Sequence, residues 1–268
     1  MNLARFYDGK VVVITGSSRG IGREMARLAL ASGARVVLNG RDAVTVEACR
    51  QALGTERTLA FAADVSLQGG AEALVVAALS AWGRIDVLVN NAGLSMRGSF
   101  ADLSPATVDA MVSGNLLSAV WATRAALPAL LESRGRVVFV SSLAAVRGFP
   151  GVSLYSAAKM ALTAVHQSLR AEERAIRSCL IYLPFTENDP EKTVLDAQGT
   201  PFRHERRASA TQEQAARAVL SAAARGRGQT VLTAAGRILF WMQSWFPGLV
   251  DFVLTRSRGS IHSVRRSS

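Results

Sequence analysis

Two residues with complementary chemistry, Tyr155 and Lys159, stand four positions apart in the stretch LYSAAKMA, which contains no Pro or Gly. On a helix this spacing places both side chains on one face, one turn apart. A fixed positive charge beside a phenol favours the phenolate and lowers the pKa of tyrosine from about 10 toward the range in which it exchanges protons. Such pairs also arise by chance in Ala-rich helices, so the spacing alone leaves both interpretations open.

A second candidate for chemistry is the glycine-rich stretch TGSSRGIG, which joins an expected strand to an expected helix. Its three glycines, Gly16, Gly20 and Gly22, permit a tight turn, a close approach of the backbone to a pyrophosphate and close packing of the helix. The first turn of that helix offers unpaired N–H groups to a phosphate. This position directly after the first strand favours a dinucleotide-binding turn.

The elements that must position these groups alternate between strands and helices. Short runs rich in Val, Ile and Leu predict buried strands, and apolar residues at helical spacing predict the helices between them. The strands are expected at 10–15, 35–39, 58–63, 85–90, 136–141, 179–183 and 230–234, and the helices at 20–33, 42–53, 69–83, 105–131, 153–175 and 210–226. This order predicts the α/β class: a single doubly wound (Rossmann) parallel seven-stranded sheet with helices on both faces.

Length and composition favour one domain over residues 1–255. The chain has 268 residues, 49% of them hydrophobic, which is enough to bury a full core. Because it lacks an apolar run typical of a secretory signal or a membrane span, we expect a cytoplasmic protein. Cys49 and Cys179 are isolated from each other and from any His pair, so we expect core thiols and neither a disulfide nor a metal site. The irregular stretch 185–209 is interpreted as a substrate loop.

The net charge of +11 comes mainly from the C-terminal part of the chain, where eleven Arg and three acidic residues follow Thr200. The stretch 256–268 is interpreted as a basic, disordered tail, because it contains too little apolar surface to order itself. A solvated tail is the first interpretation. Contact with anionic lipid or another acidic surface is the alternative, and specific binding of nucleic acid is not expected.

With the TGxxxGxG spacing, the chain resembles the short-chain dehydrogenase/reductase family. Further motifs of that family follow in order over residues 9–233, and Ser142 precedes Tyr155 by the thirteen residues that the family uses. They are Asp64-Val65 after the third strand, NNAG (Asn90 to Gly93) after the fourth, Asn115 in the next helix, Ser142 after the fifth strand, and Tyr155 with Lys159. Ordered matches of this number exclude coincidence.

The resemblance implies an oxidoreductase that transfers a hydride between a nicotinamide cofactor and a carbonyl or alcohol substrate. Tyr155 would be the acid or base, Lys159 would lower its pKa and hold the nicotinamide ribose, and Ser142 would polarise the substrate oxygen. Asn115 would kink its helix and hold a water molecule that connects the lysine to solvent. The cofactor-binding residues would be Gly16, Ser18, Arg19, Gly20, Ile21, Gly22, Arg41, Asp64, Val65, Asn91, Ala92, Gly93, Tyr155, Lys159 and Thr186.

The end of the second expected strand bears on the choice of nucleotide. Enzymes of this fold that use NAD commonly place an acid there to bind the ribose 2′-hydroxyl, whereas those that use NADP need positive charge for the 2′-phosphate. In VVLNGRD the acid position holds Gly40, followed by Arg41, and Arg19 lies inside the glycine-rich turn. The sequence therefore predicts NADP as the cofactor.

The stretch LPFTEN after the sixth strand departs from the family pattern, which usually shows Pro-Gly followed by Val and then Thr. Here Leu183 stands at the Pro position, Pro184 at the Gly position, Thr186 at the Val position and Asn188 at the Thr position. Pro fixes φ and lacks the N–H donor where Gly would permit close approach. This difference keeps an alternative open: a non-catalytic NADP-binding or membrane-peripheral interaction protein.

The C-terminal segment 237–255 is too apolar for a solvated helix, yet Gln243, Pro247 and Asp251 make it a poor membrane span. It would cover the substrate cleft, a partner subunit or a membrane interface. The cleft is favoured, because the segment and the loop 185–209 would flank the edge of the sheet where ligands bind. This placement predicts a bulky, apolar carbonyl or alcohol substrate. The apolar residues are Ile238, Leu239, Phe240, Trp241, Met242, Trp245, Phe246, Leu249, Val250, Phe252, Val253 and Leu254.

Two long helices, 105–132 and 153–175, correspond to those through which members of the family often pair. Their Ala-rich faces permit close approach of two subunits. We therefore expect a homodimer or homotetramer.

Overall fold

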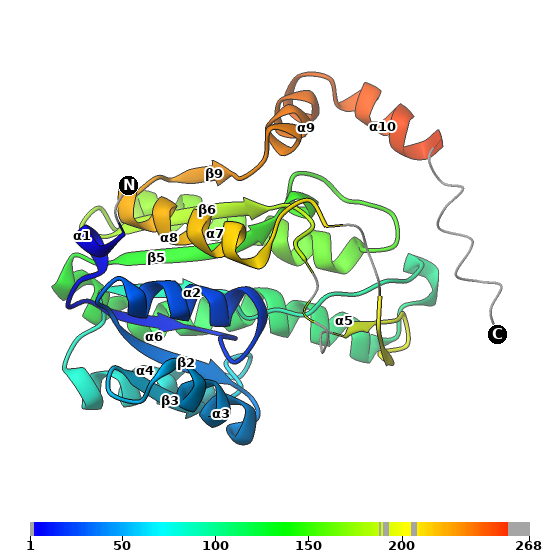
Figure 1. Cartoon of the computed structure of the whole chain (residues 1–268). Helices are drawn as coiled ribbons and strands as arrows, with labels where there is room; N and C mark the ends of the chain where they lie inside the picture. Colours follow the sequence, from blue (N-terminus) through cyan, green and yellow to red (C-terminus); the bar gives the residue numbers. More distant parts are fainter. Residues whose placement is uncertain (1–2, 188, 190–192, 205–207, 257–268) are drawn as a thin grey trace.

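Seven parallel strands form the central sheet, in the order β3-β2-β1-β4-β5-β6-β9 (Figure 1). The computed structural model describes residues 3–187, 189, 193–204 and 208–256. The predicted seven-stranded, doubly wound parallel sheet is confirmed. The strands are β1 (Val11–Ile14), β2 (Arg35–Gly40), β3 (Thr58–Ala62), β4 (Val87–Asn90), β5 (Arg136–Ser142), β6 (Arg177–Leu183) and β9 (Gln229–Val231).

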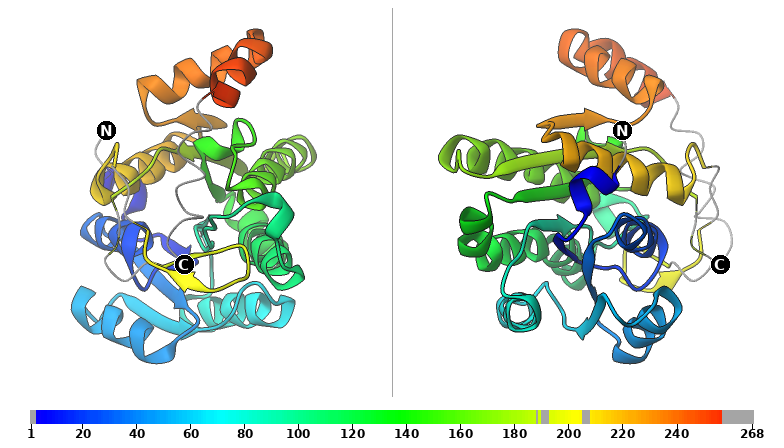
Figure 2. Two further views of the ribbon diagram at one scale, coloured as in Figure 1. Left: turned by 90° about the vertical axis from the view of Figure 1, so that its right-hand side faces the viewer. Right: turned by 60° about the vertical axis from the view of Figure 1, so that its left-hand side comes forward.

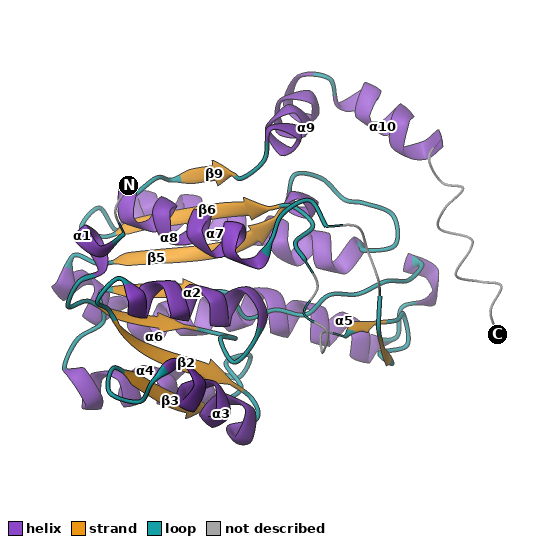
Figure 3. Ribbon diagram, in the orientation of Figure 1, coloured by secondary structure: helices purple, strands orange, loops and turns teal. Residues whose placement is uncertain are grey.

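Helices cover both faces of this sheet (Figure 3). On one face Val12 and Ile14 of β1 pack in a core with α2 and α8, and on the other face Val13 packs in a core that includes α4 and α6. Successive side chains of a strand point to opposite faces, so both faces need apolar residues. The helices are α1 (Ala4–Tyr7), α2 (Gly20–Ala31), α3 (Ala43–Leu53), α4 (Gln68–Trp82), α5 (Pro105–Val112), α6 (Ser118–Ser133), α7 (Ser153–Glu172), α8 (Gln212–Arg225), α9 (Ala234–Trp245) and α10 (Pro247–Arg256).

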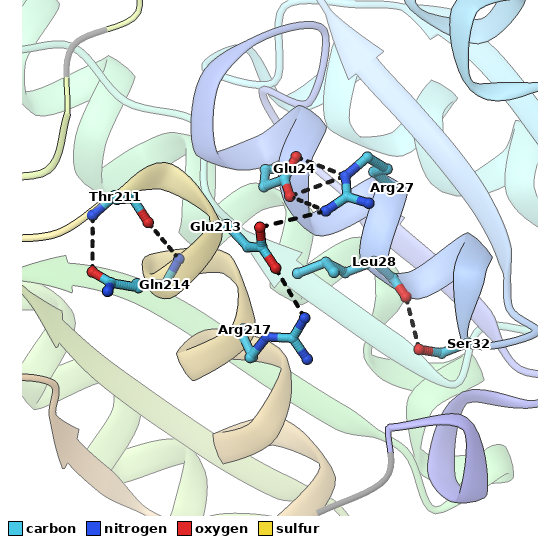
Figure 4. A network of polar contacts seen from close by, with 8 residues as sticks. All are labelled: Glu24, Arg27, Leu28, Ser32, Thr211, Glu213, Gln214 and Arg217. Carbon is cyan, nitrogen blue, oxygen red and sulfur yellow. Dashed lines mark hydrogen bonds and ion pairs between the residues drawn. The ribbon is translucent and has the colours of Figure 1, made fainter.

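Polar contacts line the solvent side of the α2–α8 pair (Figure 4). Glu213 of α8 accepts a hydrogen bond from Arg217 at 3.0 Å and pairs with Arg27 of α2 at 3.9 Å. Thr211 and Gln214 form a capping box that satisfies backbone N–H groups where α8 begins. Because the ion pairs are exposed, each contributes at most about 1 kcal/mol. The buried Ala-rich interface therefore holds the two helices together, with the cap fixing where α8 starts.

The helix expected over 105–131 is interrupted by a π-helical turn, Ser113–Leu117, between α5 and α6. At its centre the Asn115 side-chain amide donates to the Met111 carbonyl at 3.0 Å, and Asn115 Oδ1 accepts from Leu94 N–H at 3.2 Å. A π turn inserts one residue into the helical ladder and so redirects a side chain. The helical stretch expected over 105–131 therefore forms, and it is interrupted at Asn115, the residue at which the family resemblance predicted a kink. The interruption turns the buried Asn115 toward the chain that leaves β4.

The stretch 185–209, expected to be irregular, contains a short antiparallel pair, β7 (Val194–Leu195) and β8 (Pro201–Phe202). Leu195 N–H donates to the Ser95 carbonyl at 2.9 Å, and Arg97 N–H donates to the Leu195 carbonyl at 2.8 Å. These bonds fasten the pair to the chain that follows β4, at the carboxyl edge of the sheet (Figure 2).

Candidate active site

A cavity of about 850 Å³ opens at the carboxyl edge of the sheet. Its walls come from the segments that follow β1 to β6, with further residues from the π turn, α7, the 185–209 stretch and α9. Neighbouring strands β1 and β4 send their connections to opposite faces, which is where ligands of doubly wound folds bind. The cavity therefore brings together the segments that the sequence marked as functional.

The glycine-rich turn after β1 has a shape that only glycine fits. Gly16 has φ +62°, and a Cβ there would lie 2.9 Å from Ala92 Cα. A Cβ on Gly22 would overlap the Gly16 carbonyl oxygen. The backbone of this turn is thus packed tightly against the start of α2 and against the segment that follows β4. It leaves the inner side of the turn open to the cavity.

Polar residues that sequence reasoning missed hold the turn in place. Thr15 Oγ1 accepts hydrogen bonds from the N–H groups of Asn91 and Ala92, both at 3.0 Å. On the other side Ser17 Oγ donates to the carbonyl of Ile14 at 2.7 Å and accepts from Asn39 N–H at 2.9 Å. An Asn inside the apolar strand 35–39 was the available signal, because a buried amide needs hydrogen-bond partners.

The turn has the features that a pyrophosphate requires. Arg19 is the N-cap residue of α2, and its side chain makes no capping hydrogen bond, so the first N–H groups of the helix are not satisfied by their own cap. The residues around it therefore fit a dinucleotide. All of the residues expected to bind the cofactor line this one cavity: Gly16, Ser18, Arg19, Gly20, Ile21, Gly22, Arg41, Asp64, Val65, Asn91, Ala92, Gly93, Tyr155, Lys159 and Thr186.

Tyr155 and Lys159 of α7 lie on the wall of this cavity together with Ser142 from the end of β5. Lys159 is only 5% exposed, and its ammonium donates to the Val140 carbonyl at 3.1 Å. Ser142 Oγ accepts from the N–H of Ala144 at 3.2 Å, which holds the hydroxyl at the strand end. The phenol, the ammonium and the hydroxyl thus border one space.

Asn115 reaches the same wall from the π turn. Its carbonyl oxygen and the Lys159 ammonium both lie close to Gly93, because a Cβ built on Gly93 would be 2.7 Å from Asn115 Oδ1 and 3.3 Å from Lys159 Nζ. Any larger residue at position 93 would push these two groups aside. Gly93 therefore sets the spacing between the amide and the ammonium.

The LPFT stretch after β6 forms another part of the wall. Leu183 is buried at the strand end, and Pro184 and Phe185 line the cavity. Thr186 is 6% exposed and its hydroxyl donates to the Pro184 carbonyl at 3.2 Å. Asn188, the residue at the family's Thr position, lies outside the described residues.

Several wall residues had not been singled out from the sequence: Arg97, Glu187, Asp189 and His204. Asp189 stands at the glycine-rich turn, where its carboxylate lies 3.5 Å from the place that a Cβ on Gly20 would occupy. An acid at a phosphate-binding turn has no signature in the sequence, because the 185–209 stretch must fold back across the sheet edge to place it there.

The C-terminal segment makes a smaller contribution to the cavity than expected. Among its described side chains only Leu239 lines the wall, and Phe240 packs on Tyr182 with ring centroids 5.8 Å apart. Most of its large apolar side chains are exposed to solvent instead. The expectation that this segment forms an apolar wall of the cleft is therefore wrong, apart from Leu239.

His166 and the two cysteines do not line the cavity. His166 is buried with its Nδ1 atom 2.7 Å from Ser178 Oγ, and burial lowers its pKa to about 4. Cys49 and Cys179 are buried free thiols, as expected, and burial raises the pKa of both. These three groups are parts of the core.

Comparison with known proteins identifies the family of this chain. Residues 10–198 match the family model of short chain dehydrogenase. An 11-beta-hydroxysteroid dehydrogenase-like 4A protein from Arabidopsis thaliana is 32% identical over 249 residues, which cover 91% of this chain and 83% of that protein. A dehydrogenase/reductase SDR family member 7B from Bos taurus is 37% identical over 183 residues, which cover 64% of this chain but only 56% of the bovine protein.

Solved structures similar to this chain were captured with both types of nicotinamide cofactor. A metagenomic short-chain oxidoreductase in complex with NADP has a TM-score of 0.62 at 34% identity, covering 66% of this chain and 82% of that one. A 3-ketoacyl-(acyl-carrier-protein) reductase from Brucella melitensis, complexed with NADH, has a TM-score of 0.73 at 26% identity, covering 84% and 96%. The chain belongs to the short-chain dehydrogenase family, and is an oxidoreductase that interconverts carbonyls and alcohols with a nicotinamide cofactor.

Proposed function

We propose that the protein is an NADP-dependent oxidoreductase that acts on a bulky, apolar carbonyl or the corresponding alcohol. When bound, NADPH supplies the hydride that the carbonyl carbon accepts. The Tyr155 hydroxyl gives its proton to the substrate oxygen, and the Ser142 hydroxyl donates a hydrogen bond to the same oxygen. Lys159 stabilises the phenolate that remains. The Asn115 side chain holds a water molecule that connects the Lys159 ammonium to solvent. Oxidation of the alcohol runs these proton steps in reverse.

The nucleotide preference is argued from the end of β2. Gly40 occupies the position at which NAD-dependent enzymes carry an acid, and a Cβ there would lie 2.8 Å from Val46 Cγ2 and 3.0 Å from Ser18 Oγ. Any larger residue at position 40 would therefore have to displace the side chains of Val46 and Ser18. Arg41 and Arg19 both line the adjoining part of the cavity. Two guanidinium groups at that end favour a 2′-phosphate over a 2′-hydroxyl.

The substrate class is argued from the remaining walls. Apolar residues form a large part of the wall of the cavity that Tyr155 and Ser142 also line, and a wall of this kind favours a substrate with a large apolar body. The hydroxysteroid dehydrogenase-like relative from Arabidopsis thaliana supports the same class. These apolar wall residues are Leu94, Leu143, Phe149, Pro150, Val152, Leu183, Phe185, Val194 and Leu239.

The observation that carries the proposal is the position of Tyr155, Lys159, Ser142 and Asn115 on the wall of the same cavity as the glycine-rich turn. The test is a panel of aldehydes, ketones and diketones with NADPH, followed by absorbance of the reduced nicotinamide. We expect turnover that rises with the apolar size of the substrate and falls by about 10² to 10⁴ in Tyr155→Phe. If the protein binds the nucleotide but turns over no member of the panel, the proposed enzymatic function is refuted.

One observation favours the second candidate, a non-catalytic NADP-binding protein. Pro184 lies on the cavity wall where the family usually has Gly, and it offers no N–H to a ligand. The same panel separates the two candidates, because Tyr155→Phe would then behave as the unchanged protein does. Pro184→Gly supplies a second readout. If the missing N–H of this proline weakens catalysis, turnover should rise in that variant.

We also propose that two or four copies assemble through α5–α6 and α7. Both helical stretches are rich in Ala, which lets helices of two subunits approach closely. Sedimentation velocity at micromolar concentration tests this assembly, and a purely monomeric protein would contradict it.

A further inference from the structure

The outer side of α9 and α10 carries an apolar patch that the fold leaves exposed. On α9 its members recur at spacings of three and four residues, and the same spacing recurs on α10, so each helix presents one apolar stripe. Every member is at least half exposed, and Trp245 is 70% exposed. The patch consists of Ile238, Trp241, Trp245, Phe246, Leu249, Phe252 and Val253.

The opposite side of the same two helices is fastened to the protein. Arg147, in the loop before α7, donates to Gln243 of α9 at 3.2 Å and forms an ion pair with Asp251 of α10. Phe240 packs on Tyr182 of β6, and Val250 is buried. Figures 1 and 2 show α9 and α10 beyond β9, the last strand of the sheet, away from the layered domain. These contacts hold the helix pair with its apolar patch facing outward.

The two helices and the sequence that follows them carry more positive than negative charge. The two helices contain Arg237, Asp251 and Arg256, and the single acid is already paired with Arg147. The Arg256 guanidinium lies over the Phe252 ring at 4.2 Å, at the border of the patch. The sequence after Arg256 adds three more arginines and no acid. An apolar patch bordered by positive charge complements a surface that has an apolar interior beneath a layer of negatively charged groups.

A second copy of the chain fits the patch less well. In a symmetric pair the same patch faces itself, so the arginines of one copy would approach those of the other. The only acid on the two helices is already paired with Arg147, so the same helices of a second copy offer those arginines no further carboxylate. An anionic lipid surface meets the arginines with opposite charge and receives the Trp side chains at the depth that Trp prefers.

We propose that the α9–α10 patch docks the protein on the surface of an anionic membrane. Among the described helices none is long and apolar enough to cross a bilayer. The helix pair therefore lies in the plane of the headgroups, with Trp241, Trp245 and Phe252 inserted at the boundary with the acyl chains. This property is independent of the nucleotide, the substrate and turnover.

The experiment measures binding of the full chain to vesicles of phosphatidylcholine alone and of phosphatidylcholine mixed with phosphatidylserine. A triple variant, Trp241→Gln with Trp245→Gln and Phe252→Gln, removes the centre of the patch. A matched control, Val44→Gln with Val76→Gln and Phe100→Gln, removes three exposed apolar side chains from other elements. All six side chains are more than half exposed, so both variants keep the core intact.

We expect binding to the mixed vesicles to fall about a hundredfold in the patch variant and to stay unchanged in the control. Replacing Arg237, Arg256 or Arg258 by Gln should cost about fivefold each, at low salt and only on vesicles with phosphatidylserine. Failure of the unchanged protein to bind either vesicle, or equal binding by the patch variant, would overturn the proposal. Sedimentation without lipid completes the test: self-association lost in the patch variant, without vesicle binding, would assign the patch to a second copy.

Discussion

The side-chain ammonium of Lys159 donates a hydrogen bond to the carbonyl oxygen of Val140, 3.1 Å away, in a part of the fold that solvent hardly reaches. Burying an ammonium is costly unless it finds acceptors, and this carbonyl is one of them. A second bond, from Ser141 Oγ to the backbone carbonyl of Lys159 at 3.2 Å, ties the same turn of α7 to β5. The strand thus fixes the position of the cation beside Tyr155.

Replacing the ammonium separates its electrostatic role from its structural one. In Lys159→Met we expect kcat to fall about a hundredfold or more, because the phenolate of Tyr155 loses its neighbouring charge. The free energy of unfolding should change by no more than about 2 kcal/mol, since a buried charge is removed along with its hydrogen bond. Ser141→Ala is the matched control and should lose about 1 kcal/mol of stability while keeping most activity. Unchanged kcat in Lys159→Met would contradict the assigned role.

The glycine-rich turn gives a prediction with an internal control. Gly22→Ala places a methyl group into the Gly16 carbonyl oxygen, so the turn must shift. We expect the Kd for NADPH to rise about a hundredfold and the free energy of unfolding to drop by about 1 to 3 kcal/mol. Gly69→Ala in α4 meets nothing within 4 Å and should instead stabilise by about 0.5 to 1 kcal/mol. Calorimetric titration and urea unfolding measure both quantities.

Much of this molecule could be predicted from its sequence, because local patterns determine its strands and its phosphate turn. Runs such as VVVI in β1 are apolar on both faces, and only a covered parallel sheet buries them. The apolar spacing of 105–131 continues through the π turn around Asn115, so only the family resemblance of Asn115 indicated an interruption there. The sequence also does not decide where the apolar residues of α9 and α10 face, because apolarity alone does not tell a cleft from an exposed surface.

Long-range placement explains the other omissions. Asp189 is far in sequence from Gly20, and nothing local to either residue brings them together. Thr15 fixes the turn through bonds to Asn91 and Ala92, which belong to a different strand connection. Residues of this kind act through the tertiary fold, so their roles emerge only when the sheet order is known.

The nucleotide preference should depend on Arg41. Arg41→Asp puts a negative charge where a 2′-phosphate would lie, and we expect the affinity for NADPH to fall about ten- to hundredfold while that for NADH changes little. Arg124→Asp reverses the same charge on α6, away from the cavity, and should leave both affinities unaltered. An unchanged ratio of the two dissociation constants in Arg41→Asp would refute the assignment of NADP.

Asp189 should oppose the binding of the nucleotide. Its carboxylate lies beside Gly20, at the N-terminal end of α2, where a pyrophosphate would bind. The negative charges of the carboxylate and the pyrophosphate repel each other. Asp189→Asn keeps the shape of the side chain and should tighten NADPH binding about three- to tenfold at low salt, with a smaller gain at high salt. The control Asp109→Asn removes an exposed acid of α5 outside the cavity. Weaker binding in Asp189→Asn would mean that the carboxylate supports the turn.

His166 predicts how stability depends on pH. Burial lowers the pKa of this imidazole to about 4, with a smaller contribution from Arg170, whereas in the unfolded chain it is near 6.5. Between these values the unfolded chain binds the proton and the folded protein does not. The contribution of His166 to the free energy of unfolding is therefore largest above pH 6.5, and it is lost as the pH drops toward 4. The loss is about 3 kcal/mol at most.

Urea unfolding at intervals from pH 7 to about pH 4 measures this dependence on the titration of a buried imidazole. In His166→Gln the part of the slope below pH 6.5 that comes from His166 should disappear, because the amide does not titrate yet still reaches Ser178. Ser178→Ala removes the 2.7 Å contact but keeps the buried imidazole, so it should lower stability at every pH and retain the slope. If the pH profile of His166→Gln runs parallel to that of the unchanged protein, folding does not lower the pKa of His166, and the prediction is wrong.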